Sequence, residues 1–172
     1  FAQGAEAAAA ELGIEVELKY SWQYGASFSA SPELQTMAKG WYEPGTEIIF
    51  ACGGSMFDSI TAAASANDAY VVGVDVDQST QSETVITSAL KGLKSATEWA
   101  IAKNYNGEWD TVGDVATSLG ANNDAVGLPT ETWSMEVFTV EEYNALMDAI
   151  KAGTLVVDNT DYQGDAITNV EF

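Results

Sequence analysis

The amino-acid sequence predicts an α/β fold in which a Rossmann-like parallel sheet is flanked by helices. Residues 70–78, YVVGVDVDQ, hold a short β-branched run bounded by polar residues, which is typical of a strand buried on both faces. Residues 47–52, EIIFAC, have the same character. Helical patterns alternate with such segments, and this alternation indicates parallel strands joined by right-handed crossovers.

Local signals define the elements in order along the chain. An Ala-rich stretch that stops at Gly13 predicts the first helix, and apolar residues at every second position predict the strand after it. Ser31 as N-cap, followed by Pro32, opens the second helix, and the capping-box form of 139–142 opens the last one. The predicted helices are 1–12, 31–42, 57–66, 92–104 and 139–152. The predicted strands are 14–20, 47–52, 70–74, 84–88, 124–128 and 155–157.

The composition excludes several classes of partner. The 172 residues include 26 acidic residues and six lysines but no arginine, and the net charge is −20. This charge repels nucleic acid and anionic lipid headgroups, so we expect neither as a partner. Arginine is the usual bidentate clamp for phosphates and carboxylates, and its absence argues against a phosphorylated or acidic ligand. No apolar run approaches the roughly 18 residues of a membrane span.

The sequence offers no set of catalytic or metal-binding residues. Histidine, the commonest general base and metal ligand, is absent. Cys52 stands alone in a predicted apolar strand, where a thiol is inert, so we expect no disulfide, metal or cofactor. Ser55 follows two glycines but lies in no GxSxG motif. These features favour ligand binding without chemistry, and we do not expect an enzyme.

Four loops follow predicted strands, and they meet at one edge if the sheet is parallel. Ligands of open α/β sheets bind at the carboxyl ends of the strands. We therefore expect the ligand site to be formed by these loops. They are 21–28, 53–58, 75–78 and 88–91.

Two carboxylates and one lysine at this edge suit a ligand that carries hydroxyl groups. A carboxylate that faces a vicinal diol accepts hydrogen bonds from it, as in the recognition of a ribose. We predict ligand contact for Asp75, and turn capping or a supporting role for Asp77. Lys91 is either a donor to the same hydroxyls, a partner of Asp75 or a surface lysine, and its position after the fourth strand favours a functional role.

Glycines and aromatic residues complete the predicted site. Gly53 and Gly54 either let a ligand approach the backbone or only form a tight turn from strand to helix. Phe28, Trp22 and Tyr24 carry rings that can stack on a planar group. We expect one or two of these rings to face the ligand and the others to pack locally.

The run EIIFACGGSMFDSITAAASANDAYVVGVDVDQ, followed by SETVITSALKG, resembles the basic membrane protein family of substrate-binding lipoproteins, also called the purine nucleoside receptor family. The segments ASFSASPELQTMA and FAQGAEAAA fit as well, so the resemblance covers about residues 1–157. It implies a type I periplasmic binding protein, in which two Rossmann-like lobes close on a nucleoside. It also implies a bacterial protein anchored by a lipid outside the cytoplasmic membrane, which delivers its ligand to the permease of an ABC transporter.

The resemblance further implies roles for individual residues. Asp75 and Lys91 would hold the ribose hydroxyls. Phe28 would form one face of an aromatic clamp on the base, while Gly53 and Gly54 would line the cleft.

The chain departs from the family pattern after its two glycines. The family has a further Gly and an Asn in the stretch where this chain reads Ser-Met-Phe-Asp at 55–58. Asp58 would replace the Asn, and Phe57 would narrow the site. The resemblance also predicts that residues 1–117 form the second lobe and that 118–172 return to complete the first lobe and the hinge. Most of the first lobe, with the signal peptide and the lipid-bearing cysteine, would then precede this chain.

Four functional hypotheses follow from these patterns. Capture of a nucleoside for import is the first, and binding of a free sugar by the same fold is its alternative. A sensor domain that reports ligand occupancy to a partner protein would use the same closure. An enzyme lobe acting on a nucleoside would need a base and a nucleophile that the sequence lacks.

Overall fold

The structure is a computed structural model that describes residues 1–21, 23–24, 27–157 and 170–171. Trp22 and most of the polar C-terminal tail lie outside the described residues. The helices are α1 (Ala2–Leu12), α2 (Pro32–Tyr42), α3 (Met56–Ser65), α4 (Leu93–Tyr105) and α5 (Val140–Lys151), with the 3₁₀ turns η1 (Trp109–Thr111) and η2 (Ala121–Asn123). The strands are β1 (Leu18–Lys19), β2 (Ile48–Phe50), β3 (Tyr70–Asp75), β4 (Val85–Lys91), β5 (Val126–Gly127) and β6 (Val170–Glu171).

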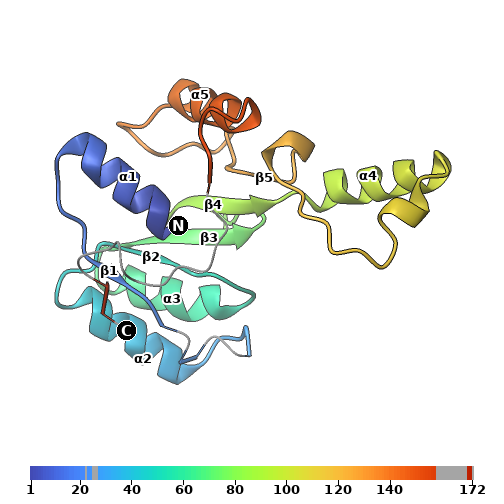
Figure 1. The fold of residues 1–172 in the computed structure, drawn as a ribbon. Coiled ribbons are helices and arrows are strands. Elements are labelled where there is room, and N and C mark those ends of the chain that lie inside the picture. Colours follow the sequence, from blue (N-terminus) through green and yellow to red (C-terminus); the bar gives the residue numbers. More distant parts are fainter. Residues whose placement is uncertain (22, 25–26, 158–169, 172) are drawn as a thin grey trace.

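Four strands form one sheet in the order β2-β3-β4-β5 (Figure 1). β2, β3 and β4 run parallel to one another, and β5 is antiparallel to β4. The register pairs Ile49 with Val71 and Asp75 with Leu90, and it shifts once, between Val71 and Val72. The α/β fold with a mainly parallel sheet is therefore confirmed.

Helices lie on both faces of this sheet: α2 and α3 on one face, α1 and α5 on the other (Figure 1). The main core lies between the sheet and the first pair, where Leu34, Ile60 and Val71 are at most 2% exposed. Burial of each such side chain contributes about 1.5–3 kcal/mol to stability. The opposite face is covered less tightly, because α5 has no buried residue. There the ring of Phe1 stacks on Phe50 with 5.3 Å between the ring centroids.

Two helix starts and one helix end follow the local signals in the sequence. The Ser31 hydroxyl accepts a hydrogen bond from the Leu34 amide at 3.1 Å, which caps α2. At α5 the Thr139 hydroxyl accepts from the Glu142 amide at 3.2 Å, and the Glu142 carboxylate accepts from the Thr139 amide at 2.8 Å. Gly13 ends α1 in the left-handed conformation, with φ of 66°. These three predictions are confirmed.

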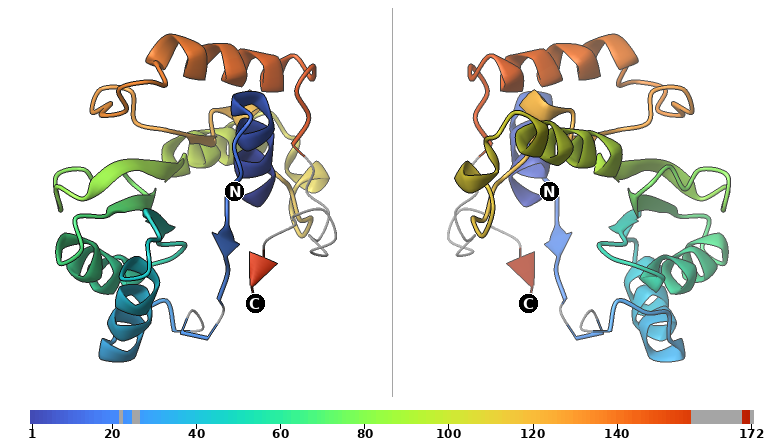
Figure 2. Two further views of the ribbon diagram at one scale, coloured as in Figure 1. Left: turned by 90° about the vertical axis from the view of Figure 1, so that its left-hand side faces the viewer. Right: turned by 90° about the vertical axis from the view of Figure 1, so that its right-hand side faces the viewer.

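Two predicted strands differ in the structure. Only the end of 14–20 is a strand, and this β1 pairs with β6 instead of joining the four-stranded sheet (Figure 2). Ile14 and Val16 are 55% and 37% exposed, so the apolar side of this segment has little cover among the described residues. Residues 155–157 form no strand, and all three side chains are exposed. Alternation and β-branching indicate a local preference only, and a strand also needs a neighbour for its backbone.

Helix α4 extends away from the sheet (Figure 1), and none of its residues is buried. Among the described residues, no helix combines the length and the apolarity that a membrane span requires.

Candidate functional site

The carboxyl ends of β2, β3 and β4 meet at one edge of the sheet, because the three strands are parallel. This edge carries Gly53 beyond β2, Asp75 at the end of β3 and Lys91 at the end of β4. The sequence places Lys91 after a strand that ends at Ser88, but β4 continues through Lys91. The extension arises because Leu90 and Lys91 gain a partner in β5 on their other side.

Asp75 ends β3 in a sharp turn of the backbone. Its φ is 67°, a left-handed conformation that Asp tolerates better than most residues. The turn is closed by a hydrogen bond from the Val76 amide to the Val74 carbonyl at 2.8 Å. The Asp75 side chain is partly buried, and its carboxylate makes no hydrogen bond or ion pair with any described residue. It therefore remains available to a ligand within the described part of the chain.

Lys91 differs from the other lysines. Each of the other five forms an ion pair with a carboxylate. Lys91 forms none with a described residue, although the chain carries 26 acidic residues. Leu90, the neighbour of Lys91, pairs with Asp75 across the sheet. Asp75 and Lys91 therefore lie at the ends of adjacent strands. Asp75 and Lys91 thus share the edge of the sheet at which the sequence predicts a ligand (the ligand edge), with their positions one residue out of register.

Asp77 is occupied by contacts within the chain. Its carboxylate accepts hydrogen bonds from the Thr132 hydroxyl at 2.7 Å and from the Ser79 amide at 3.0 Å. The Thr132 hydroxyl and then the Ser79 amide hold the pKa of Asp77 below its usual value, because both stabilise the charged form. Asp77 thus caps its own turn and joins it to a loop 55 residues further along the chain.

Phe28 lies against the two glycines. Its carbonyl accepts a hydrogen bond from the Ser55 amide at 3.0 Å, which brings the 21–30 loop to the ligand edge without β1 being in the sheet. A Cβ on Gly53 would lie 2.3 Å from the Phe28 ring, and one on Gly54 would lie 2.3 Å from the Phe28 carbonyl oxygen. Gly53 and Gly54 also have positive φ, 150° and 49°. Both glycines are therefore required by the contact with Phe28, whose side chain stays 58% exposed.

The remaining candidates of this region have different surroundings. Asp58 is exposed in the first turn of α3, where the negative charge of a carboxylate interacts favourably with the helix dipole. Tyr24 packs against the core, and Trp22 lies outside the described residues. Cys52 was expected inside an apolar strand, but β2 ends at Phe50 and the thiol is exposed. The strand ends early because the chain turns into the two glycines.

Two further residues support this edge and had no role in the sequence analysis. The Gln78 side-chain oxygen accepts a hydrogen bond from the backbone amide of Val74 at 2.8 Å, and the backbone amide of Gln78 donates to the Ser88 hydroxyl at 3.1 Å. Both residues are buried, at 8% and 0% exposed. A Cβ on Gly73 would meet both side chains within 2.7 Å. These bonds fix the turn that carries Asp75, and a polar Ser in a buried strand is the signal that could have revealed them.

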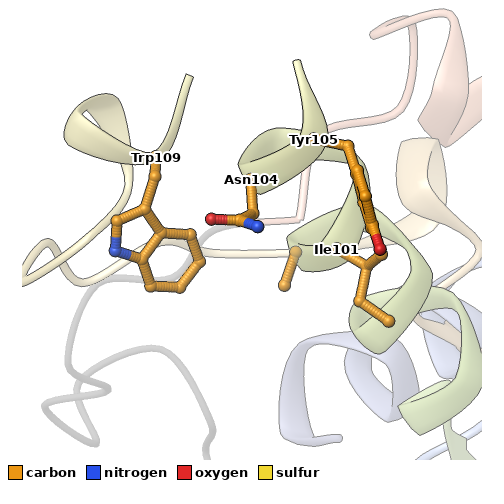
Figure 3. A pocket seen from close by; sticks show the side chains of 5 residues that line it. Ile101, Asn104, Tyr105 and Trp109 are labelled. Atoms are coloured by element: carbon orange, nitrogen blue, oxygen red, sulfur yellow. The ribbon is translucent and has the colours of Figure 1, made fainter. Parts of the chain in front are cut away.

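A separate hollow lies on α4 and η1 (Figure 3), and α4 extends away from the sheet (Figure 1). It is shallow and open, with a volume of about 310 Å³. No charged side chain lines it, and none of the strand-end candidates contributes to it. Its lining residues are Ala100, Ile101, Asn104, Tyr105 and Trp109.

The carboxyl ends of the strands are where open α/β sheets bind ligands, and here they carry hydrogen-bonding groups and an exposed ring. The family of PnrA-like ABC transporter substrate-binding proteins (Bmp) matches residues 1–161, and the chain belongs to this family. Its fold is that of the periplasmic binding proteins that serve ABC transporters. No curated protein matches the chain.

Solved structures of solute-binding proteins share this fold. An ABC transporter solute-binding protein from Aeropyrum pernix K1 superposes with a TM-score of 0.61 and 21% identity, over 92% of this chain and 52% of that one. A solute-binding protein of an ABC transporter system from Conexibacter woesei DSM 14684 gives a TM-score of 0.53 and 21% identity, over 73% of this chain and 41% of that one. The chain thus spans about half the length of the first structure and about two fifths of the second.

Proposed function

We propose that this chain is the ligand-binding lobe of an extracytoplasmic, lipid-anchored receptor that captures a nucleoside for an ABC importer. In this proposal residues 1–117 form the second lobe, residues 118–172 return toward the first lobe and the hinge, and the ligand lies between the two lobes. The receptor delivers the nucleoside to the permease without chemistry. Membership of a substrate-binding family supports the transport role.

The observation that carries the ligand class is the pair of unpartnered groups on adjacent strand ends. Asp75 offers an acceptor and Lys91 offers a donor, and neither is satisfied by a described residue. Together they match a vicinal diol, whose hydroxyls both donate and accept. With one carboxylate, one lysine and no arginine to bind a phosphate, this edge favours a neutral ligand over a phosphorylated one.

The aromatic side of the site supports a base. The ring of Phe28 is held by its contact with Gly53 and is 58% exposed, so a planar group can stack on it. Such stacking contributes about 1–3 kcal/mol per base. A free sugar, the alternative ligand, would use Asp75 and Lys91 but would gain less from Phe28.

A thermal-shift titration of a protein with both lobes present tests the proposal. The ligands are inosine, adenosine, guanosine, cytidine, ribose and AMP. A ligand at about 100 times its Kd stabilises the native state by about 2.7 kcal/mol, which is readily detected. A shift with nucleosides but not with ribose or AMP supports the receptor. A thermal shift with ribose alone would indicate that the ligand is a free sugar and not a nucleoside. Equal shifts with adenosine and AMP would contradict the proposal that the site prefers a neutral ligand.

Substitutions then test the two strand-end groups. Asp75→Asn keeps a residue that tolerates φ of 67° but weakens the acceptor, and Lys91→Gln removes the charge. Hydrogen bonds to charged groups contribute about 1.5–3 kcal/mol, so each variant should bind nucleoside roughly 10- to 100-fold more weakly. Lys94→Gln is the matched control, because Lys94 lies on the exposed helix α4. Unchanged affinity in both variants would exclude the diol site.

A further inference from the structure

Strand β5 holds the end of β4 that carries Lys91. Leu90 and Lys91 pair with Gly127 and Val126, and the Gly92 amide donates to the Ala125 carbonyl at 2.8 Å. β5 is only two residues long and forms the edge of the sheet. A ladder this short frays easily unless something else holds the strand.

Helix α5 holds β5 from its far side. The Tyr143 hydroxyl accepts a hydrogen bond from the Leu128 amide at 2.9 Å. The same oxygen lies close to the backbone of Gly127, because a Cβ there would be 3.0 Å from it. An ion pair of 3.0 Å between Lys151 and Asp124 ties the end of α5 to η2, just before β5. The edge strand is thus fastened between β4 and α5.

Tyr143 itself is held firmly. Its ring lies 5.6 Å from the ring of Trp133, centroid to centroid, at an angle of 42°. Trp133 is fixed in turn by a hydrogen bond from its indole nitrogen to the Phe138 carbonyl at 2.8 Å. The hydroxyl of Tyr143 therefore has a defined position from which to hold the Leu128 amide.

We propose that Tyr143 is a positioning residue for Lys91. It keeps β5 in register with the end of β4, and this register sets where the Lys91 ammonium lies at the ligand edge. The proposal rests on the proposed function only for the role of Lys91 in binding a diol. It also makes α5 a link between the segment after residue 118 and the ligand edge, in addition to the hydrogen bond from Thr132 to Asp77.

The test compares Tyr143→Phe with Tyr42→Phe. The second variant is a matched control, because the Tyr42 hydroxyl also bonds to the backbone, donating to the Tyr70 carbonyl at 2.9 Å, but on the core side of the sheet. The first readout is amide hydrogen exchange in the protein with both lobes. Exchange at Leu128 and Gly92 should accelerate about fivefold in Tyr143→Phe, the factor that corresponds to one ordinary hydrogen bond. Unchanged exchange at Gly92 would overturn the proposal.

The second readout is the contribution of the diol to affinity, measured as the Kd of a 2′,3′-dideoxynucleoside divided by that of the nucleoside. Tyr143→Phe should lower this ratio about fivefold, whereas Tyr42→Phe should leave it unchanged. In a Lys91→Gln background, Tyr143→Phe should have no further effect on the ratio. A purely structural role of Tyr143 would weaken both ligands equally, and that result refutes the proposal.

The two proposals fail in different ways. If the wild-type protein binds no nucleoside but Tyr143→Phe still accelerates hydrogen exchange at the Leu128 and Gly92 amides, the proposed ligand is wrong. The proposal that Tyr143 positions the Lys91 backbone then stands. If nucleosides bind and the amides do not respond, the positioning proposal is wrong and the receptor stands.

Discussion

Replacement of Gly53 by Ala tests the contact that places Phe28 at the ligand edge. At Gly53 φ is 150°, a conformation that residues with a side chain rarely adopt, and this costs an Ala about 1–3 kcal/mol. The new Cβ would also lie 2.3 Å and 2.8 Å from two carbons of the Phe28 ring, so the ring must move. Displacement from its rotamer adds about 0.5–1.5 kcal/mol. The total loss of stability is therefore about 1.5–4.5 kcal/mol.

The assay is urea unfolding followed by circular dichroism, with a double-mutant cycle. In a Phe28→Ala background the ring is absent, so Gly53→Ala should cost only the backbone part, about 1–3 kcal/mol. Gly40→Ala is the control, because Gly40 lies inside α2 with nothing within 4 Å of a new Cβ. That change should stabilise the protein by about 0.5–1 kcal/mol. A cost of Gly53→Ala below about 0.5 kcal/mol would refute the argument from backbone conformation, and equal costs in both backgrounds would refute the clash.

Three further predictions concern stability. Ser31→Ala removes the cap that binds the Leu34 amide and should lower the free energy of unfolding by about 1 kcal/mol in urea titrations. Ile60→Ala empties a site that is 2% exposed and should cost about 2–5 kcal/mol, and a loss below 1 kcal/mol would contradict its place in the core. Thr132 and Ser79 lower the pKa of Asp77, so the stabilisation is present above the ordinary Asp pKa of about 3.9 and is lost as pH falls through the lowered value. The stability difference between wild type and Asp77→Asn should therefore shrink as pH falls toward 2, and a constant difference would exclude this linkage.

The sequence by itself determined the features that depend on neighbouring residues. Ser31 and the Thr139–Glu142 pair mark helix starts because a side chain caps amides only two or three positions away. The β-branched run at 70–74 identifies a buried strand because composition and length are local properties. The order of helices and strands then implies the parallel sheet, and with it the common edge for Gly53, Asp75 and Lys91.

The tertiary structure decided which of these groups meet and which remain free. Phe28 lies against Gly53 because its carbonyl accepts a hydrogen bond from the Ser55 amide. The strand before it, β1, does not belong to the four-stranded sheet. Asp77 is engaged by a hydroxyl 55 residues away, and β5 extends β4 to Lys91. No local pattern encodes these contacts, because they depend on how distant segments pack and which backbone edges become available for pairing. Local signals thus define the elements, and packing decides that Asp75 and Lys91 form no ion pair with a described residue.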